Sequence, residues 1–310
     1  MSATRITSSM TTRSVLSDLN RIAAQQDLTR RQMSSGKAIT KPSDDPYGAA
    51  RAMSLRTDLA GVKQHQRNVD EAQSWMSATS TTLSSITDLA QKARELTVQG
   101  ATDTLSQSGR DAIADQIDQL IAGMKQEGNA TYDGRYVLGG SRTNTPPYDA
   151  TLTKTDPSVT ANDAYSGDAA SQLREIGPGV TLAVNVHGDE VLGGASGSSG
   201  NLLGVLRDIA THLRSGDTAA LGGGDIKAVS DQIDNLLAVQ ARVGAGMNRL
   251  DTASSRLAQI EESTTSMLSN TEDADMAEVI TNYSTQQAVY QSALNAGARI
   301  VQTSLLDFLH

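Results

Sequence analysis

Apolar residues recur every three or four positions in several long stretches of the chain, which is the spacing of an amphipathic helix. In the N-terminal half, this pattern predicts a helix over about residues 7–34, a longer helix from Pro46 to about residue 99, and a third over 108–127. Each apolar stripe needs a partner that covers it. The first half of the chain is therefore expected to be helical and to pack against other helices.

The pattern is most regular in the C-terminal part of the chain. From Ile226 to Leu257, most positions of a continuous seam are apolar, which favours coiled-coil-like packing. A last stripe runs from Met276 to Phe308. Because neither terminal set of helices can bury its stripe alone, we expect the N- and C-terminal helices to pair.

The middle of the chain has a different pattern. Residues 141–199 hold four of the six prolines and show no helical stripe, and residues 180–186 alternate apolar with polar or small residues, as a half-buried strand does. The segment 187–190 (His-Gly-Asp-Glu) indicates a turn, and 193–200 has the composition of a linker. The predicted fold class is mainly α, with long antiparallel helices from the N- and C-terminal halves packed as a coiled-coil-like bundle and a small β-rich inserted domain.

A short connector is predicted between the first two helices. Gly36 stands where a left-handed residue ends a helix, and Asp45 can cap the next helix with Pro46 at its first position. Asp44 and Asp45 could act as a general acid and base, but no second catalytic group accompanies them. The expected connector or hinge residues are Gly36, Pro42, Ser43, Asp44, Asp45 and Pro46.

Composition narrows the classes of function. One Trp, one Phe and seven Tyr favour packing through aliphatic side chains over one large aromatic-rich core. The chain has no cysteine, which excludes disulfides, thiol catalysis and cysteine zinc sites. No apolar run has the length of a membrane span or the form of a secretory signal, so we expect neither membrane insertion nor Sec export.

Charge is distributed unevenly along the chain. The net charge of −9 disfavours nucleic acid or an anionic membrane as the main partner. Residues 1–56 carry nine Lys or Arg against four Asp or Glu, whereas residues 251–310 carry two Arg against eight Asp or Glu. Opposite signs at the two ends indicate that the ends lie side by side and complement each other.

Candidate metal and phosphate sites are weak. The four histidines are dispersed, and the glycine-rich segments 193–200 and 222–225 lack the Gly-Lys-Ser/Thr of a phosphate loop. The acidic segment 270–278 lacks the alternating ligands of an EF-hand, and we interpret Asp275 and Glu278 as a capping-box start of the last helix. We expect no catalytic residue, no metal, no cofactor and no enzymatic activity.

Three segments in order resemble one known family. They are SSGKAITKPSDDPYGAARAMSLR (34–56), VGAGMNRLDTASSRL (243–257) and EDADMAEVITNYSTQQAVYQSALNAGARIVQTSLLDFL (272–309), and together they resemble the flagellin family. Pro-Ser-Asp-Asp-Pro at 42–46 and GRYVLGGSRTNTPPYD at 134–149 resemble the branch that joins hook and filament. The resemblance covers about residues 5–149 and 200–310.

The resemblance implies a division into four parts. Residues 1–34 and 275–310 would form an inner terminal coiled coil, and 35–45 a connecting spoke. Residues 46–140 and 200–274 would form a helical rod, with 141–199 as an outer β-rich insert.

The resemblance also implies a structural role in the bacterial flagellum. The chain would form the junction layer between the first hook-associated protein and flagellin by helical self-assembly. It would be exported by the flagellar type III route without a cleaved signal peptide, bound before secretion by an export chaperone, and would function outside the cell. The alternative is a flagellin filament subunit. Its abundance would distinguish the two roles, because a filament holds many thousands of copies and a junction only a few.

The stripes of the first and last helices stay uncovered in a single chain, so we expect them to form the assembly interface. The predicted interface residues are Leu19, Ile22, Ile280, Tyr283, Tyr290, Leu294, Val301, Leu305 and Phe308. An enzymatic alternative, a protease domain inserted into such a chain, would need a His-Glu-x-x-His motif, which the sequence lacks. A signalling or adhesin coiled coil would need a membrane anchor or a seam that continues through the middle.

Overall fold

The computed structural model describes residues 8–149, 163–194 and 201–308, and helices dominate them. The helices are α1 (Ser8–Ser35), α2 (Pro46–Gly100), α3 (Gln107–Gly128), α4 (Gly188–Val191), α5 (Leu202–Ser215), α6 (Thr218–Ala220), the π-helical turn η2 (Leu221–Asp225), α7 (Ile226–Glu272) and α8 (Met276–Phe308). The prediction of a mainly α fold is confirmed.

The strands form two small antiparallel sheets. They are β1 (Thr131–Tyr132) with β2 (Arg135–Tyr136), and β3 (Leu173–Gly177) with β4 (Val180–Ala183). Asp133 and Gly134 both have positive φ, as a two-residue hairpin turn of the primed type requires. The strand predicted at 180–186 is present as β4, which covers its first four residues.

Local signals set the helix ends. Gly36 adopts φ +70° directly after α1, and its amide donates to the Gln32 carbonyl at 2.8 Å. Asn201 caps α5 through its side chain, which accepts from the Gly204 amide, and Gly216 ends α5 in the left-handed region. These caps set the two ends of α5, a helix that the periodicity did not predict.

One segment differs from its sequence-based interpretation, and another forms an element that the sequence did not predict. Residues 187–190 begin the helical turn α4 with His187 at the N-cap position, so the predicted plain turn is wrong. The three glycines at 222–224 lie in the π-helical turn η2, which ends at Asp225. There, the Asp225 carboxylate lies 2.7 Å from Nδ1 of His212.

No helix in the described part of the chain is both long and apolar enough to cross a membrane.

The chain divides into two compact units. Unit 1 contains residues 1–61 and 260–310, and unit 2 contains residues 62–259. The long helices α2 and α7 each contribute residues to both units.

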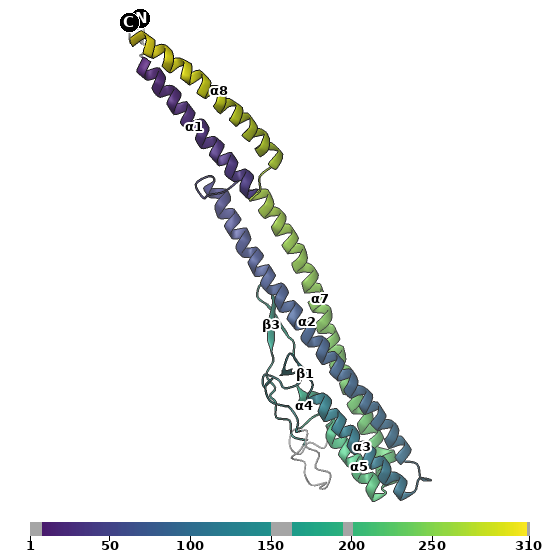
Figure 1. Cartoon of the computed structure of the whole chain (residues 1–310). Coiled ribbons are helices and arrows are strands. Elements are labelled where there is room, and N and C mark those ends of the chain that lie inside the picture. Colours follow the sequence, from purple (N-terminus) through teal and green to yellow (C-terminus); the bar gives the residue numbers. More distant parts are fainter. Residues whose placement is uncertain (1–7, 150–162, 195–200, 309–310) are drawn as a thin grey trace. The chain divides into compact units, whose positions relative to one another are not determined.

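Unit 1 is built around the pair α1 and α8. The two helices lie side by side (Figure 1) and run antiparallel, because Gly36 contacts Ala274 at one end while Val15 approaches Gly297 at the other. A Cβ atom on Gly297 would lie 3.0 Å from a methyl group of Val15. The helices therefore come close at this glycine.

Unit 2 holds the hydrophobic core. Helices α3 and α5 pack together (Figure 1), and α2 and α7 contribute Met76 and Gly246, which are in close contact. The core is lined by fully buried aliphatic side chains. Examples are Leu83, Ile86, Ile117, Ile121, Met124, Leu138, Leu192, Leu202, Leu203 and Leu206.

Candidate functional site

The connector pairs with the break between α7 and α8. The Ala38 amide donates to the Glu272 carbonyl at 2.7 Å, and the Ala274 amide donates to the Gly36 carbonyl at 2.9 Å. Lys37 and Asp273 thereby form an isolated antiparallel bridge. The end of α1 and the end of α7 are thus joined by two backbone hydrogen bonds within unit 1.

Glu272 is a buried carboxylate at this bridge. Its side chain is 8% exposed, and it accepts a hydrogen bond from Lys37 Nζ at 2.6 Å and another from the Arg56 guanidinium. Lys37 lies at the start of the connector and Arg56 lies in α2. One carboxylate therefore binds cations from both sides of the connector.

A turn built on Asp44 shapes the connector. The Asp44 carboxylate accepts from the Thr40 hydroxyl at 2.8 Å and from the Thr40 and Lys41 amides at 3.2 and 2.9 Å. These hydrogen bonds, with that from the Thr40 hydroxyl the largest, lower the pKa of Asp44 below its ordinary value. Pro42 and Ser43 are the exposed residues inside this turn.

The start of α2 is capped as the sequence predicts. Asp45 Oδ1 accepts from the Tyr47 and Gly48 amides at 3.1 and 3.0 Å, and Pro46 is the first helical residue. A Cβ atom on Gly48 would lie 2.6 Å from the Ile39 side chain, so the connector packs closely on this first turn. The Asp44 and Asp45 carboxylates are engaged in a turn and a cap, an arrangement that accounts for both without catalysis.

The start of α8 has a similar cap. Asp275 Oδ1 accepts from the Ala277 and Glu278 amides at 2.9 and 3.3 Å. Three residues, 273–275, separate α8 from α7. Both helix breaks of unit 1 are therefore short and defined by side-chain caps.

The predicted assembly residues fall into three groups. Leu19, Ile22, Tyr283 and Tyr290 are half-buried, whereas Ile280 and Leu294 are 51% and 44% exposed. The side chains of Val301, Leu305 and Phe308 lie outside the described residues. Among the α8 residues whose burial the structure describes, Val279, which the sequence analysis did not select, is the buried apolar side chain. The assembly role of these residues stays a prediction.

The terminal helices carry their charge differently. In α1, Asp18 pairs with Arg21, and Asp27 pairs with both Arg30 and Arg31. In α8, residues 279–298 contain no charged side chain. Three of the four arginines of α1 are thus paired within their own helix, and Lys37 and Arg56 carry the expected pairing between the two ends of the chain.

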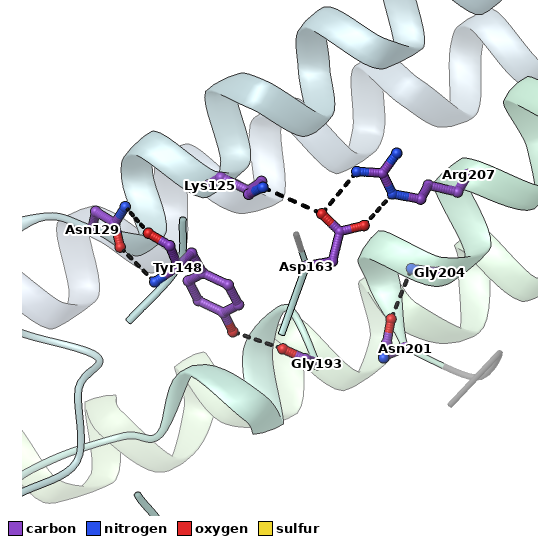
Figure 2. Close-up of polar contacts among 8 residues, drawn as sticks. All are labelled: Lys125, Asn129, Tyr148, Asp163, Gly193, Asn201, Gly204 and Arg207. Atoms are coloured by element: carbon purple, nitrogen blue, oxygen red, sulfur yellow. Dashed lines mark hydrogen bonds and ion pairs between the residues drawn. The ribbon is translucent and has the colours of Figure 1, made fainter. Parts of the chain in front are cut away.

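A second polar cluster lies in unit 2. Figure 2 shows Asp163 between Lys125 of α3 and Arg207 of α5. The Arg207 guanidinium binds both carboxylate oxygens, with one contact at 2.8 Å, and Lys125 Nζ lies 3.4 Å from Asp163 Oδ1. Lys125 is 2% exposed. We call these three residues the Asp163 anchor, because they attach the middle segment of the chain to both helices.

Tyrosines continue this attachment. The Tyr148 hydroxyl donates to the Gly193 carbonyl at 2.8 Å, and Asn129 exchanges two hydrogen bonds with the Tyr148 backbone (Figure 2). Tyr165 packs on Tyr148 and donates to the Leu138 carbonyl at 2.8 Å. Burial raises the pKa of Tyr148 well above its ordinary value and that of Tyr165 to about 12. Both hydroxyls are thus neutral donors at physiological pH.

Neither cluster has the form of a catalytic centre. In the parts of the chain that the structure describes, no three His, Asp or Glu side chains are grouped to hold a metal ion. The carboxylates of Glu272 and Asp163 are each neutralised by two cations, which suits structural attachment. The sequence analysis missed both. The acidic run 272–275 next to a helix break was the available signal for Glu272, and nothing in the sequence pairs Asp163 with its cations.

Comparisons with known proteins agree with this architecture. Residues 6–143 match the bacterial flagellin N-terminal helical region, and residues 226–309 match the bacterial flagellin C-terminal helical region. These two regions frame the segment that carries β3, β4, α4 and α5.

Individual relatives extend over most of the chain. Flagellar hook-associated protein 3 of Escherichia coli (strain K12) is 26% identical over 86% of this chain and 87% of its own length. Flagellin of Bacillus subtilis (strain 168) is 25% identical over 90% of this chain and 91% of its own length. The solved structure of the flagellar junction protein FlgL from Legionella pneumophila has a similar fold, with a TM-score of 0.57 over 72% of this chain and 99% of that one, at 15% identity. By both of its helical regions, this chain belongs to the bacterial flagellin family.

Proposed function

We propose that this chain is a structural protein of the flagellum that forms the junction layer between hook and filament by self-assembly. The observation that carries the proposal is the outer face of α8. Ile280 and Leu294 are exposed there, and residues 279–298 have no charge that would favour contact with water. α1 covers one side of α8 only, so a second copy or a neighbouring flagellar protein is the fitting cover for the other.

Three features favour a junction subunit over a filament subunit. The first relative described above is named hook-associated protein 3, and the structural neighbour is titled a junction protein. The sequence Pro-Ser-Asp-Asp-Pro at 42–46 resembles that branch. The first hook-associated protein would then bind on the hook side, flagellin on the filament side, and copies of this chain within the layer.

The division into parts and the export route belong to the same proposal. Residues 1–34 and 275–310 would form the inner terminal coiled coil, 35–45 the spoke, 46–140 and 200–274 the rod, and 141–199 the outer insert. The chain would leave the cell by the flagellar type III route without a cleaved signal peptide, after release from an export chaperone.

Deletion of the chain tests the proposal. Cells that lack a junction layer should make flagellin, keep the hook and release flagellin into the medium, and a plasmid copy should restore filaments. Normal filaments in the deletion strain would overturn the proposal.

The second candidate is a filament subunit. It is favoured by the Bacillus subtilis flagellin, which aligns over nearly the full length of both chains. Quantification in purified flagella separates the two functions, because a filament subunit is present in many thousands of copies and a junction subunit in few.

A further inference from the structure

The connector of unit 1 interrupts its helices. α1 ends at Ser35, and the chain crosses residues 36–45 before α2 begins, while α7 and α8 are separated by residues 273–275. The pair α1 and α8 is thus attached to the rest of unit 1 through two non-helical segments. Contacts other than a continuous helix must therefore fix the orientation of the α1–α8 pair.

Hydrophobic packing gives little of this restraint. Ala52 and Val279 are the buried apolar side chains among the described residues of unit 1. Burial of an alanine and a valine contributes little compared with a full aliphatic core. Directional polar contacts at the breaks must therefore supply much of the orientation.

Glu272 is placed to supply it. Its carboxylate is 8% exposed, which is costly unless cations and hydrogen bonds compensate for lost hydration. Lys37 stands one residue after Gly36, and Arg56 stands in the third turn of α2. Since Glu272 is itself the last residue of α7, one side chain ties the end of α1, the start of α2 and the end of α7 together.

We propose that Glu272 is a positioning residue that locks the two helix breaks of unit 1 together and so holds the α1–α8 pair in the orientation that assembly needs. We call Lys37, Arg56 and Glu272 the Glu272 lock. The assembly part of this inference rests on the proposed function, whereas the lock itself is a property of the single chain.

The backbone bridge supplies a direct readout in the purified monomer. The Ala38 and Ala274 amides donate across the two breaks, so their hydrogen exchange reports whether the bridge opens. Glu272→Gln keeps the shape of the side chain and removes its charge. We expect exchange at these two amides to accelerate about 10- to 100-fold, because the substitution weakens one or two hydrogen bonds to charged groups.

Matched variants separate the lock from a general effect of lost charge. Glu262→Gln changes an exposed carboxylate of α7, ten residues before Glu272, and should leave both amides unchanged. Lys37→Met and Arg56→Met should each accelerate exchange, and Lys37→Met should add little in a Glu272→Gln background. Unfolding of unit 2, followed by Trp75 fluorescence, should be unaffected in every variant.

The same variants test the assembly role in cells. Glu272→Gln should release flagellin into the medium severalfold above wild type, and Glu262→Gln should not. Unchanged exchange at Ala38 and Ala274 in Glu272→Gln would overturn the lock. Faster exchange with normal filaments would overturn its role in assembly but not the proposed junction function, which the deletion strain tests separately.

Discussion

Units 1 and 2 are stabilised in different ways. Unit 2 buries large aliphatic side chains completely, including Leu83, Ile117 and Leu206, whereas the buried apolar residues described in unit 1 are Ala52 and Val279. At roughly 1.5–3 kcal/mol for a fully buried large aliphatic side chain, the core of unit 2 can hold its helices without help. Unit 1 relies on caps, a two-bond backbone bridge and the Glu272 lock.

This difference fits the proposed roles. A pair of helices with a thin seam is marginally stable in water, and its stripes gain most when further helices cover them. In the proposed interface, the exposed Ile280 and Leu294 are the side chains that would supply this gain. The stable core and the proposed assembly surface thus belong to separate units, so that this surface can stay uncovered without unfolding the core.

The largest expected contrast is in amide exchange. In a verified monomer, amides of α3 and α5 should be protected to near the global free energy of unfolding, whereas those of α1 and α8 should open locally. We expect exchange in the terminal pair to be at least about a thousandfold faster, since domain stabilities are several kcal/mol. Hydrogen exchange with mass spectrometry measures both regions in one sample, and equal protection of the two pairs would contradict the comparison.

The next contrast concerns ion pairs. Asp163→Ala removes the carboxylate from the buried Lys125 and should destabilise unit 2 by about 3–5 kcal/mol. Asp27→Ala removes a carboxylate from Arg30 and Arg31 on exposed α1 and should cost about 0–1 kcal/mol. Urea unfolding followed by Trp75 fluorescence for unit 2, and exchange for α1, measures the two costs. A cost for Asp163→Ala as small as that of a surface pair would mean that the Asp163 anchor does not hold the middle segment.

Two leucines in helices give a matched pair of truncations. Leu206→Ala in α5 removes a fully buried side chain and should destabilise the monomer by about 2–5 kcal/mol. Leu294→Ala in α8 changes a side chain that is 44% exposed and should alter monomer stability by less than about 0.5 kcal/mol.

In assembly, Leu294 should matter far more than its small effect on monomer stability indicates. Leu294→Ala should impair filament retention in cells although the monomer is intact. Normal retention, with no flagellin in the medium, would remove Leu294 from the predicted interface.

Helix positions could be predicted because the signals for them are local. The predicted spans 7–34, 46–99 and 108–127 agree with α1, α2 and α3 to within one residue at each end, since periodicity and caps are properties of neighbouring residues. α5 was not predicted although Asn201 and Gly216 bracket a regular apolar stripe, because the linker-like segment 193–200 directly precedes it and obscures its start. The helix was readable from the same rules.

The contacts between distant segments could not be predicted. Glu272 lies 235 residues from Lys37 and 216 from Arg56, and nothing local distinguishes it from Asp273 and Asp275, which are exposed. The phase of the α8 stripe was not predicted either, since Val279 is buried and its neighbour Ile280 is exposed. Which residue of an acidic or apolar run is buried depends on the partner, and the partner is set by the tertiary structure.

The smallest expected contrast is in alkaline stability, and it should be confined to unit 2. The pKa of Tyr165 is raised by burial to about 12, against about 10 in an unfolded chain. Between these values the unfolded state loses the proton and the folded state keeps it. The stabilisation is therefore complete below about pH 10 and is lost as pH rises towards 12.

Tyr165→Phe isolates this contribution. At neutral pH the variant should lose about 1 kcal/mol, because the hydrogen bond that the Tyr165 hydroxyl donates to the Leu138 and Asp168 carbonyls is lost. Above pH 10, unit 2 of the variant should lose stability less steeply than wild type in Trp75-detected unfolding, while Tyr148 still ionises late in tyrosinate absorbance. Parallel slopes for the two proteins would show that Tyr165 does not retain its proton in the folded state, and the attachment of the middle segment would then depend on the Asp163 anchor and Tyr148.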